Sequence, residues 1–359
     1  MGQSPKSNKN ITSHGANVFL FSGHFQKWLT QLIYAFRSGK KTLDLELATG
    51  GIISETGQIP LSRRLENSLI KEGCSMASGT VIAARNYDEE RALYHLTDAV
   101  VRDCSFAGPA DGESVLKECR NITVENCRFS LRYPLWHARN FLLTASELDE
   151  KTRAPIWYCT DGKIQDCRID GVKCLRECHR ISVTHSEIHS PEFGWKSAEL
   201  RISDSEIESE YFLLDSRAVT LDRIRMKGKY SFQYMQDLTI RNSVLDTKDA
   251  FWHSKNVTVS DSVVKGEYLG WFSEGLTLIN CEISGTQPLC YCKNLKLIHC
   301  TMHGADLAFE YSDVDADICG AIDSVKNPRS GKITADAIGK IIREDAVMDC
   351  CADIVIRNT

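Results

Sequence analysis

One eight-residue phrase recurs along the chain at a constant spacing, and this repeat limits the possible folds more than any other feature. Its sixth residue, here called the anchor, is usually Cys or Ser, and the anchors from Cys167 to Cys319 are evenly spaced, nineteen positions apart, eight times in succession. Copies of the phrase include Ile122–Phe129 (ITVENCRF), Ile181–Ile188 (ISVTHSEI), Leu238–Leu245 (LTIRNSVL), Val257–Val264 (VTVSDSVV) and Leu276–Ile283 (LTLINCEI). Self-similarity at a fixed period is typical of solenoids, in which each repeat stacks on the next.

Each repeat predicts short β-strands rather than a helix. The residues three before and two after the anchor are apolar in every copy from Cys127 to Cys300, which is the alternation of a strand. Residue types that tolerate a positive φ angle recur six before the anchor, and glycine recurs four after it, so each repeat turns at least two corners. A repeat this short therefore has no room for a helix as well.

These features predict an all-β chain folded as a single-stranded parallel β-helix with coils of about 19 residues. A leucine-rich repeat is the alternative, because the LxLxxC pattern resembles its strand, but its period is usually about 20–29 residues. The left-handed hexapeptide helix is excluded because the period is not a multiple of six.

The composition excludes several classes of protein. With 42% hydrophobic and 25% charged residues in 359, the chain is neither disordered nor collagen-like. A formal charge of −5 without a Lys/Arg stripe argues against a nucleic-acid partner. No window approaches about 18 consecutive apolar residues, so no membrane association is predicted. The 15 cysteines occur without a secretion signal, so we expect reduced thiols and a cytoplasmic location.

Ten of the 15 cysteines fall into two columns, the anchor and the position eight before it, where Ser takes most other places. A small, soft side chain suits the inside of a tight bend, so we expect interior packing of these thiols. The closest groupings are Cys174 with Cys178 and His179, Cys290 with Cys292, and Cys350 with Cys351. None has the paired CxxC spacing of a zinc site, so we predict no metal and no cofactor.

Five of the six tryptophans share one position, ten before the anchor: Trp136, Trp157, Trp195, Trp252 and Trp271. Strict alternation from the Cys/Ser column points these rings inward, as a buried or half-buried aromatic stack. However, Arg176 and Gln233 occupy the same column, and a dry core does not accept such groups unpaired. The alternative is a row of rings that flanks a groove and stacks on sugars or bases.

The next position, nine before the anchor, is expected to face outward. It carries His137, Tyr158, Glu177, Lys196, Asp215, Tyr234, His253, Phe272, Tyr291 and Glu310. Together with the tryptophans, the candidate ligand-binding residues in it are His137, Tyr158, Lys196, Tyr234 and His253.

Two carboxylates of this column are candidate catalytic residues. Glu177 and Asp215 lie two coils apart, about 9–10 Å, which is at the upper edge of the separation used by inverting glycosidases. Lys196 stands between them, and the simpler interpretation is a series of weak cross-strand charge pairs. A general acid and base is the alternative.

A further outward stripe, one and three after the anchor, is rich in oxygen ligands that could hold Ca²⁺: Glu147, Asp149, Asp170, Glu187, His189, Glu206 and Glu208. Arginines and lysines interrupt both columns, as on a solvated charged face, so no cation site is predicted here.

The chain divides into three regions. Residues 1–75 lack the period and form an N-terminal extension, in which Phe25–Phe36 has the apolar spacing of an amphipathic helix. The β-helix is predicted over residues 76–319, and residues 320–359 are expected to form irregular coils or a cap. A solenoid must protect its open sheet edges, so the extension is a candidate cap, and oligomers through the ends or the exposed face are an alternative.

Several ordered motifs resemble domain-of-unknown-function family 3737. They are Asp88–Tyr94 (DEERALY), Gly112–Glu118 (GESVLKE), Tyr133–Trp136 (YPLW), Asp249–Trp252 (DAFW), Gly266–Trp271 (GEYLGW), Leu276–Cys281 (LTLINC), Leu307–Ser312 (LAFEYS) and Ser324–Gly331 (SVKNPRSG). The resemblance covers roughly residues 85–345 and implies a right-handed, pectin-lyase-like β-helix. The family implies no activity and no catalytic residues, and a shared fold does not settle function.

From these features we expect a non-catalytic binding scaffold whose long face displays aromatic and charged columns to an extended ligand such as a glycan. A polysaccharide lyase or glycoside hydrolase of the pectin-lyase-like type is the alternative, with Glu177 and Asp215 as acid and base. A purely structural or assembly module is a third interpretation.

Overall fold

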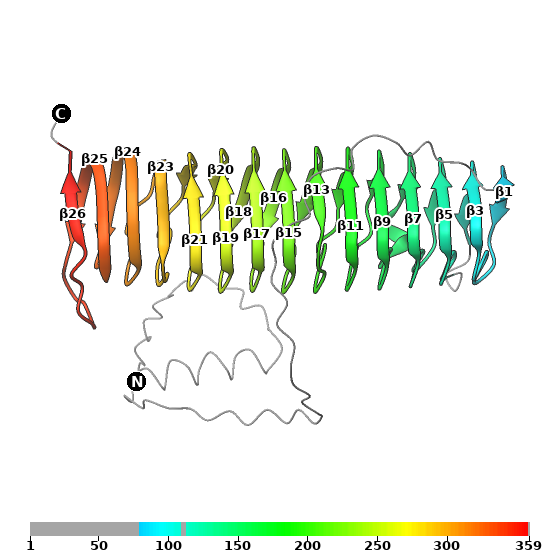
Figure 1. The fold of residues 1–359 in the computed structure, drawn as a ribbon, viewed down its shortest axis with the longest axis horizontal. Helices are drawn as coiled ribbons and strands as arrows, with labels where there is room; N and C mark the ends of the chain where they lie inside the picture. Colours follow the sequence, from blue (N-terminus) through cyan, green and yellow to red (C-terminus); the bar gives the residue numbers. More distant parts are fainter. Residues whose placement is uncertain (1–78, 109–112, 358–359) are drawn as a thin grey trace, which may run out of the picture. The chain divides into compact units, whose positions relative to one another are not determined.

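The computed structural model describes residues 79–108 and 113–357, which form β-strands and turns with one 3-10 turn, η1 (Glu150–Thr152). The strands form two parallel stacks, called sheet A and sheet B, along one axis (Figure 1). The predicted N-terminal extension and its helix at Phe25–Phe36 lie outside the described residues.

Sheet A receives one strand from each coil. Its strands are β1 (Thr80–Ala83), β3 (Thr97–Arg102), β5 (Arg120–Glu125), β7 (Arg139–Thr144), β9 (Thr160–Gln165), β11 (His179–Thr184), β13 (Arg201–Ser203), β15 (Arg217–Asp222), β17 (Gln236–Arg241), β19 (Lys255–Ser260), β21 (Glu274–Ile279), β23 (Leu295–His303), β24 (Asp313–Lys326), β25 (Ser330–Ile342) and β26 (Asp353–Ile356). The long strand β23 also pairs with the last short strand of sheet B, so it runs around the corner between the sheets.

Sheet B is made of shorter strands. They are β2 (Asn86–Tyr87), β4 (Ser105–Ala107), β6 (Arg128–Ser130), β8 (Glu147–Leu148), β10 (Arg168–Ile169), β12 (Glu187–His189), β14 (Glu206–Ser209), β16 (Arg225–Lys229), β18 (Val244–Lys248), β20 (Val263–Lys265) and β22 (Glu282–Ser284). All of their pairings are parallel, as the fixed period requires.

The register confirms the predicted parallel β-helix. Ile188 pairs with Ile207, its equivalent one repeat later, and the main-chain N–H of Thr301 donates to Cys281 O at 2.9 Å, which places Cys300 beside Cys281. In Figure 1 the sheet A strands at the front point upward and each later coil lies further to the left, as in a right-handed coil.

The third side of each coil is the segment between a sheet B strand and the next sheet A strand, such as residues 131–138 or 266–273. Isolated parallel bridges link these segments from coil to coil, for example between Trp136 and Trp157. Alternate residues have left-handed backbone angles, with φ of 57° at Leu135 and 55° at His137. The third side therefore bends at every second residue instead of running as an extended strand.

The core is a stack of inward columns. Phenylalanines lie over one another in it, with ring centroids 4.9 Å apart for Phe232 and Phe251. Neighbouring coils also compensate in size. A Cβ on Gly162 would lie 2.3 Å from Cζ of Phe141, so this glycine leaves the room that the phenylalanine of the preceding coil fills.

The Cys/Ser columns are interior, as expected, and they satisfy main-chain groups at the bends. Ser146 Oγ accepts from Cys127 N at 3.0 Å and donates to Thr144 O at 2.8 Å. All fourteen described cysteines are free thiols and eleven are buried. Burial raises the pKa of the Cys119 thiol to about 12, so this group packs as a neutral side chain.

The C-terminal coils depart from the period. A register shift in β24 pairs Cys300 with Ile318, so the predicted anchor at Cys319 is wrong and Cys319 is exposed. The next coil is shorter, because Asp313 pairs with Ser330, which comes before a full repeat is complete, and β25 and β26 add two further strands to sheet A within the predicted irregular region 320–359.

Candidate functional site

The tryptophan column lies on the third side, half-buried rather than in the core. Leu135 and Ala138 of the same coil are both fully buried, with Trp136 and His137 between them facing outward. Strict alternation therefore fails here, because the left-handed residues bend the chain so that two inward positions lie three residues apart.

The indole groups tie each coil to the next. Trp195 Nε1 donates to Tyr211 O at 2.7 Å, and Trp252 Nε1 donates to Tyr268 O at 2.7 Å. Trp136 and Trp271 make the equivalent bonds, to Ala154 O and Gln287 O, and Gln233 replaces the indole with its amide, which donates to Asp249 O at 3.2 Å. The polar member Gln233 is thus paired, which explains how it shares the column.

Arg176 occupies the tryptophan column between two rings. Its guanidinium carbon lies 5.3 Å from the ring centroid of Trp157 and 5.0 Å from that of Trp195, within the range of cation–π contacts. Its Nη1 also lies 3.3 Å from Glu192 Oε2. Trp157 Nε1 is buried and has no hydrogen-bond partner in the described part of the chain.

The adjacent outward column forms two ring stacks. The first joins His137 and Tyr158, whose centroids are 4.9 Å apart. The second runs through four coils, from Tyr234 through His253 and Phe272 to Tyr291, with centroid separations of 5.1, 5.0 and 4.8 Å. Tyr158 and Tyr234 are each 38% exposed and Phe272 is 42% exposed, so both stacks present rings to solvent.

Partial burial changes the acid–base behaviour of the second stack. Burial raises the pKa of Tyr234, raises that of Tyr291 to about 12, and lowers that of His253. Each shift favours the neutral form, so the stack is uncharged at neutral pH.

Three charged residues separate the two stacks: Glu177, Lys196 and Asp215. They lie in consecutive coils, because Glu177 N donates to Trp195 O and Lys196 N donates to Leu214 O. Lys196 and Asp215 are exposed and Glu177 is half-buried, and none forms an ion pair within residues 79–108 and 113–357. The catalytic role of Glu177 and Asp215 stays a prediction.

Tyrosines thirteen before the anchor belong to the same surface, and the sequence reasoning missed them. Tyr133 lies 5.0 Å from Trp136 and Tyr268 lies 5.4 Å from Trp271, centroid to centroid. Tyr211 and Tyr230 stack at 5.1 Å. Counting by the same repeat would have found this column, since all four share one position relative to the anchor.

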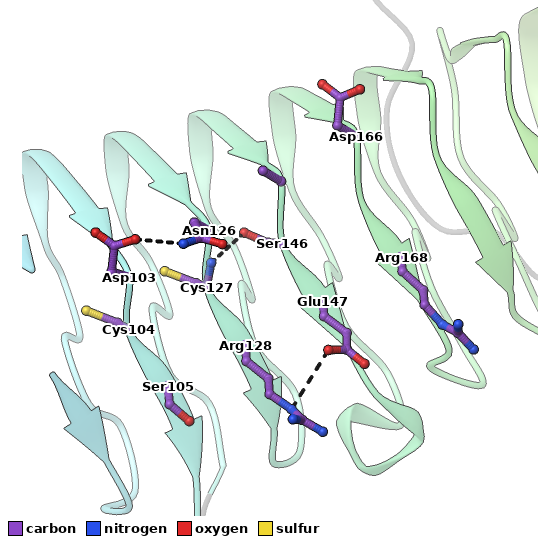
Figure 2. Close-up of a pocket in the computed structure, with 11 residues that line it drawn as sticks. Asp103, Cys104, Ser105, Asn126, Cys127, Arg128, Ser146, Glu147, Asp166 and Arg168 are labelled. Atoms are coloured by element: carbon purple, nitrogen blue, oxygen red, sulfur yellow. Dashed lines mark hydrogen bonds and ion pairs between the residues drawn. The ribbon is translucent and has the colours of Figure 1, made fainter. Parts of the chain in front are cut away.

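A separate hollow of about 790 Å³ lies where sheet A turns into sheet B (Figure 2). Asn126 Nδ2 donates to Asp103 Oδ1 at 2.7 Å in its upper row, which also contains Asp166, and Ala145 lines the hollow as well. The lower row is made by outward residues of sheet B: Ser105, Arg128, Glu147 and Arg168.

Two general properties complete the description of the surface. In the described residues, no group of three His, Cys, Asp or Glu side chains is placed to hold a metal ion. The same residues contain no helix that is long and apolar enough to cross a membrane.

The chain is similar to several solved structures. The A-module of the mannuronan C-5 epimerase AlgE4 of Azotobacter vinelandii is 10% identical, with a TM-score of 0.27 over 78% of this chain and 91% of that one. The tailspike protein of E. coli bacteriophage HK620, in complex with a pentasaccharide, is 9% identical, with a TM-score of 0.37 over 78% and 71%. The periplasmic alginate epimerase AlgG is 9% identical, with a TM-score of 0.25 over 74% and 77%.

Sequence comparison identifies the family. No curated protein matches the chain. The sequence model of DUF3737, described as a protein of unknown function, matches residues 80–356, which is most of the chain and confirms the resemblance of its motifs. The chain therefore belongs to the DUF3737 family.

Proposed function

We propose that the third side binds an extended glycan laid along the solenoid axis. The observation that carries this proposal is the four-ring stack from Tyr234 to Tyr291, which repeats an outward aromatic ring once per coil, exposed at Tyr234 and Phe272 and half-buried at the other two positions. A linear polymer presents similar groups at regular intervals, so a surface with a step of about 4.8 Å suits it better than a compact ligand.

The chemistry of the surface favours sugars over purely apolar partners. Tyr and His rings combine an apolar body with a polar tip, and sugars combine C–H faces with hydroxyl groups. Four of the five indole N–H groups of the column are bound to main-chain carbonyls and that of Trp157 is buried, so the available polar groups are Tyr hydroxyls, the His253 ring and the three charged residues between the stacks.

The gap between the stacks is the best place for a sugar ring. Within the described chain, Tyr158 stacks on His137 and Tyr234 stacks on His253, while Glu177 and Asp215 are their neighbours on the other side. Each tyrosine therefore keeps one face without a stacked partner in its column, and Trp157 of the same coil also lies nearly parallel to Tyr158, with centroids 5.4 Å apart. Charged groups beside these faces can form hydrogen bonds to hydroxyls, which are stronger than those between neutral groups.

The test is binding of the full chain to a panel of plant, algal and bacterial glycans, followed by calorimetry on the best ligand. Tyr158→Ala and Tyr234→Ala should each weaken binding by about 10-fold or more, because one stacking contact contributes roughly 1.4 kcal/mol or more. Ile298→Ala removes a comparably exposed apolar side chain from sheet A and should leave binding unchanged. Absence of binding across the panel, or equal loss in all three variants, would contradict the proposal.

Hydrolysis or elimination at the same site is the second candidate. Glu177 and Asp215 are outward in one column with one coil between them, and neither is ion-paired in the described residues. If they act as acid and base, Glu177→Gln and Asp215→Asn should abolish product release from the bound glycan and keep its affinity. If the variants release as much product as the wild type, or if the wild-type chain releases none, the site binds the glycan without catalysis.

A further inference from the structure

A second group of titratable side chains lies on the outer face of sheet B, away from the third side. His189 ends strand β12, and Asp170 follows strand β10 in the preceding coil. The ring Nδ1 of His189 is 2.8 Å from Asp170 Oδ1, and Arg168 Nε lies 3.1 Å from the other oxygen, Oδ2. The imidazole is thus held by a carboxylate that is itself held by a guanidinium.

The coil register determines this geometry. Arg168 pairs with Glu187 and Ile169 with Ile188, which brings Asp170 level with His189, and Asp170 N donates to Leu148 O at 2.8 Å. The Asp170 side chain is only 19% exposed, whereas that of His189 is 39% exposed. The pair therefore has a fixed inner member and an accessible outer one.

Asp170 is ionised at neutral pH. Burial alone raises the pKa of its carboxyl, but the hydrogen bonds from His189 and Arg168 outweigh this and hold the pKa below its usual value. An ionised carboxylate accepts the Nδ1 proton, which leaves the lone pair of a neutral imidazole on Nε2. Nε2 lies 3.4 Å from Glu187 Oε1.

A hollow of about 400 Å³ begins at His189 and continues over the next four coils of sheet B. Its cationic lining residues are Arg225, Lys227 and Lys265, and its acidic ones are Glu206, Glu208 and Asp246. Lys227 and Lys265 form no ion pair with the described residues, so their charges are available to a ligand. The hollow of Figure 2 ends at Arg168 on the other side of the pair.

We infer that His189 is a general base for ester hydrolysis in the hollow of about 400 Å³ on sheet B, with Asp170 as its positioning residue. The imidazole can take a proton from water, while Arg225 and Lys227, two coils further along the same hollow, supply the positive charge that balances the charge growing on the carbonyl oxygen of a bound ester. The charged groups that face His189 are Asp170 and Arg168 from the preceding coil, Glu187 from its own strand, and Glu206 and Glu208 from the next coil.

The reaction needs no co-reactant besides water. The water oxygen bonds to the ester carbonyl carbon as its proton moves to Nε2. When the ester C–O bond breaks, the same proton passes from Nε2 to the departing alkoxide, so an acid and an alcohol leave. The Asp170 carboxylate stabilises the transient imidazolium without taking its proton.

The test is hydrolysis of p-nitrophenyl acetate by the full chain, followed by release of acetate from O-acetylated oligosaccharides. His189→Gln should lower the rate about 10²-fold, the usual contribution of a positioned base. His299→Gln is the matched control, because His299 Nδ1 also lies 2.8 Å from an aspartate, Asp317, but His299 does not line this hollow. Equal rates for His189→Gln and the wild type, or equal losses in both variants, would overturn the inference.

The positioning role of Asp170 is tested through the tautomer of the His189 imidazole that its hydrogen bond selects. Asn at position 170 donates its amide hydrogen to Nδ1 and moves the ring proton to Nε2, so Asp170→Asn should lose the activity at every pH while its melting temperature stays within a few degrees. Asp170→Glu should recover part of the rate. A loss of rate that follows the loss of stability in all variants would give Asp170 a structural role only. The inference does not depend on glycan binding by the third side, and each can fail alone.

Discussion

The third side and the outer face of sheet B come from the same coils, yet they hold their side chains differently. On the third side, indole N–H groups donate to main-chain carbonyls of the next coil and rings stack at about 5 Å, so neighbouring coils hold each side chain. On sheet B, Arg225 and Glu206 are 72% and 71% exposed, and their Nε and Oε1 atoms are 3.7 Å apart. The difference shows that one repeating backbone supports two kinds of surface. The first is an aromatic row, made of the tryptophan column and the ring stacks beside it, and the second is a charged band of outward sheet B residues such as Arg225 and Glu206.

The largest expected effect tests whether the two faces share one core. Phe129 is fully buried beneath sheet B and Phe251 is 1% exposed beneath the third side. Phe129→Ala and Phe251→Ala should each lower the free energy of unfolding by about 3–5 kcal/mol, since each leaves a cavity in a close-packed stack. Denaturant unfolding followed by circular dichroism measures this. A cost below about 1 kcal/mol for either variant would show that its side of the core is loosely packed.

A smaller effect is expected from the indole hydrogen bonds. Trp252→Phe removes the bond to Tyr268 O and should cost about 1 kcal/mol more than Trp157→Phe, because Trp157 Nε1 has no partner in the described residues. The two substitutions remove the same atoms, and weakening the cation–π contact of Trp157 with Arg176 adds to the cost of Trp157→Phe, so the difference is a lower limit for the hydrogen bond. Equal melting temperatures for the two variants would mean that the indole bonds do not hold the aromatic row.

The third side should also respond to acid through His253. Burial lowers the pKa of this group, so the unfolded chain binds its proton more readily. The resulting stability is complete above the unfolded pKa of about 6.5 and is lost as the pH falls through the lower folded pKa. His253→Phe keeps a ring between Tyr234 and Phe272. It should remove the part of the acid-induced loss of stability that comes from protonation of His253. Melting temperatures of both chains between pH 7.5 and 5 measure it, and parallel curves would contradict the assignment.

The smallest effect is expected on sheet B. Glu206→Gln breaks an exposed ion pair and should change the free energy of unfolding by less than about 0.5 kcal/mol, with no change at high salt. Thermal unfolding at two salt concentrations measures this difference. A cost above about 1 kcal/mol would make the charged band as rigid as the aromatic row and remove the contrast between the two faces.

The periodicity predicted the parallel coil, the strand positions and the interior Cys/Ser columns, because these depend only on which residues repeat. It failed where the local backbone departs from an extended strand. Left-handed residues such as Leu135 and His137 break the alternation, so the tryptophans form the half-buried stack that was one of the predicted forms instead of pointing fully into the core. A one-residue shift in β24 displaced the last anchor from Cys319 to Ile318.

Contacts between particular coils were beyond sequence counting. The Asp170–His189 pair could be placed in one stripe, but the 2.8 Å bond depends on rotamers that spacing does not determine. Phe141 fills the space that Gly162 leaves in the next coil. Predicting this packing from the sequence requires that both residues be assigned to one inward column.

The linkage of every coil to its two neighbours has a mechanical consequence. Since hydrogen bonds and packing run between adjacent coils, pulling on the carboxyl terminus should detach one coil at a time from that end. Each regular coil, from one paired residue to its equivalent in the next coil, frees about 65 Å of chain when it is stretched out. Force–extension traces of the solenoid should therefore show a sawtooth of nearly equal steps, whose count reports how many coils have peeled away.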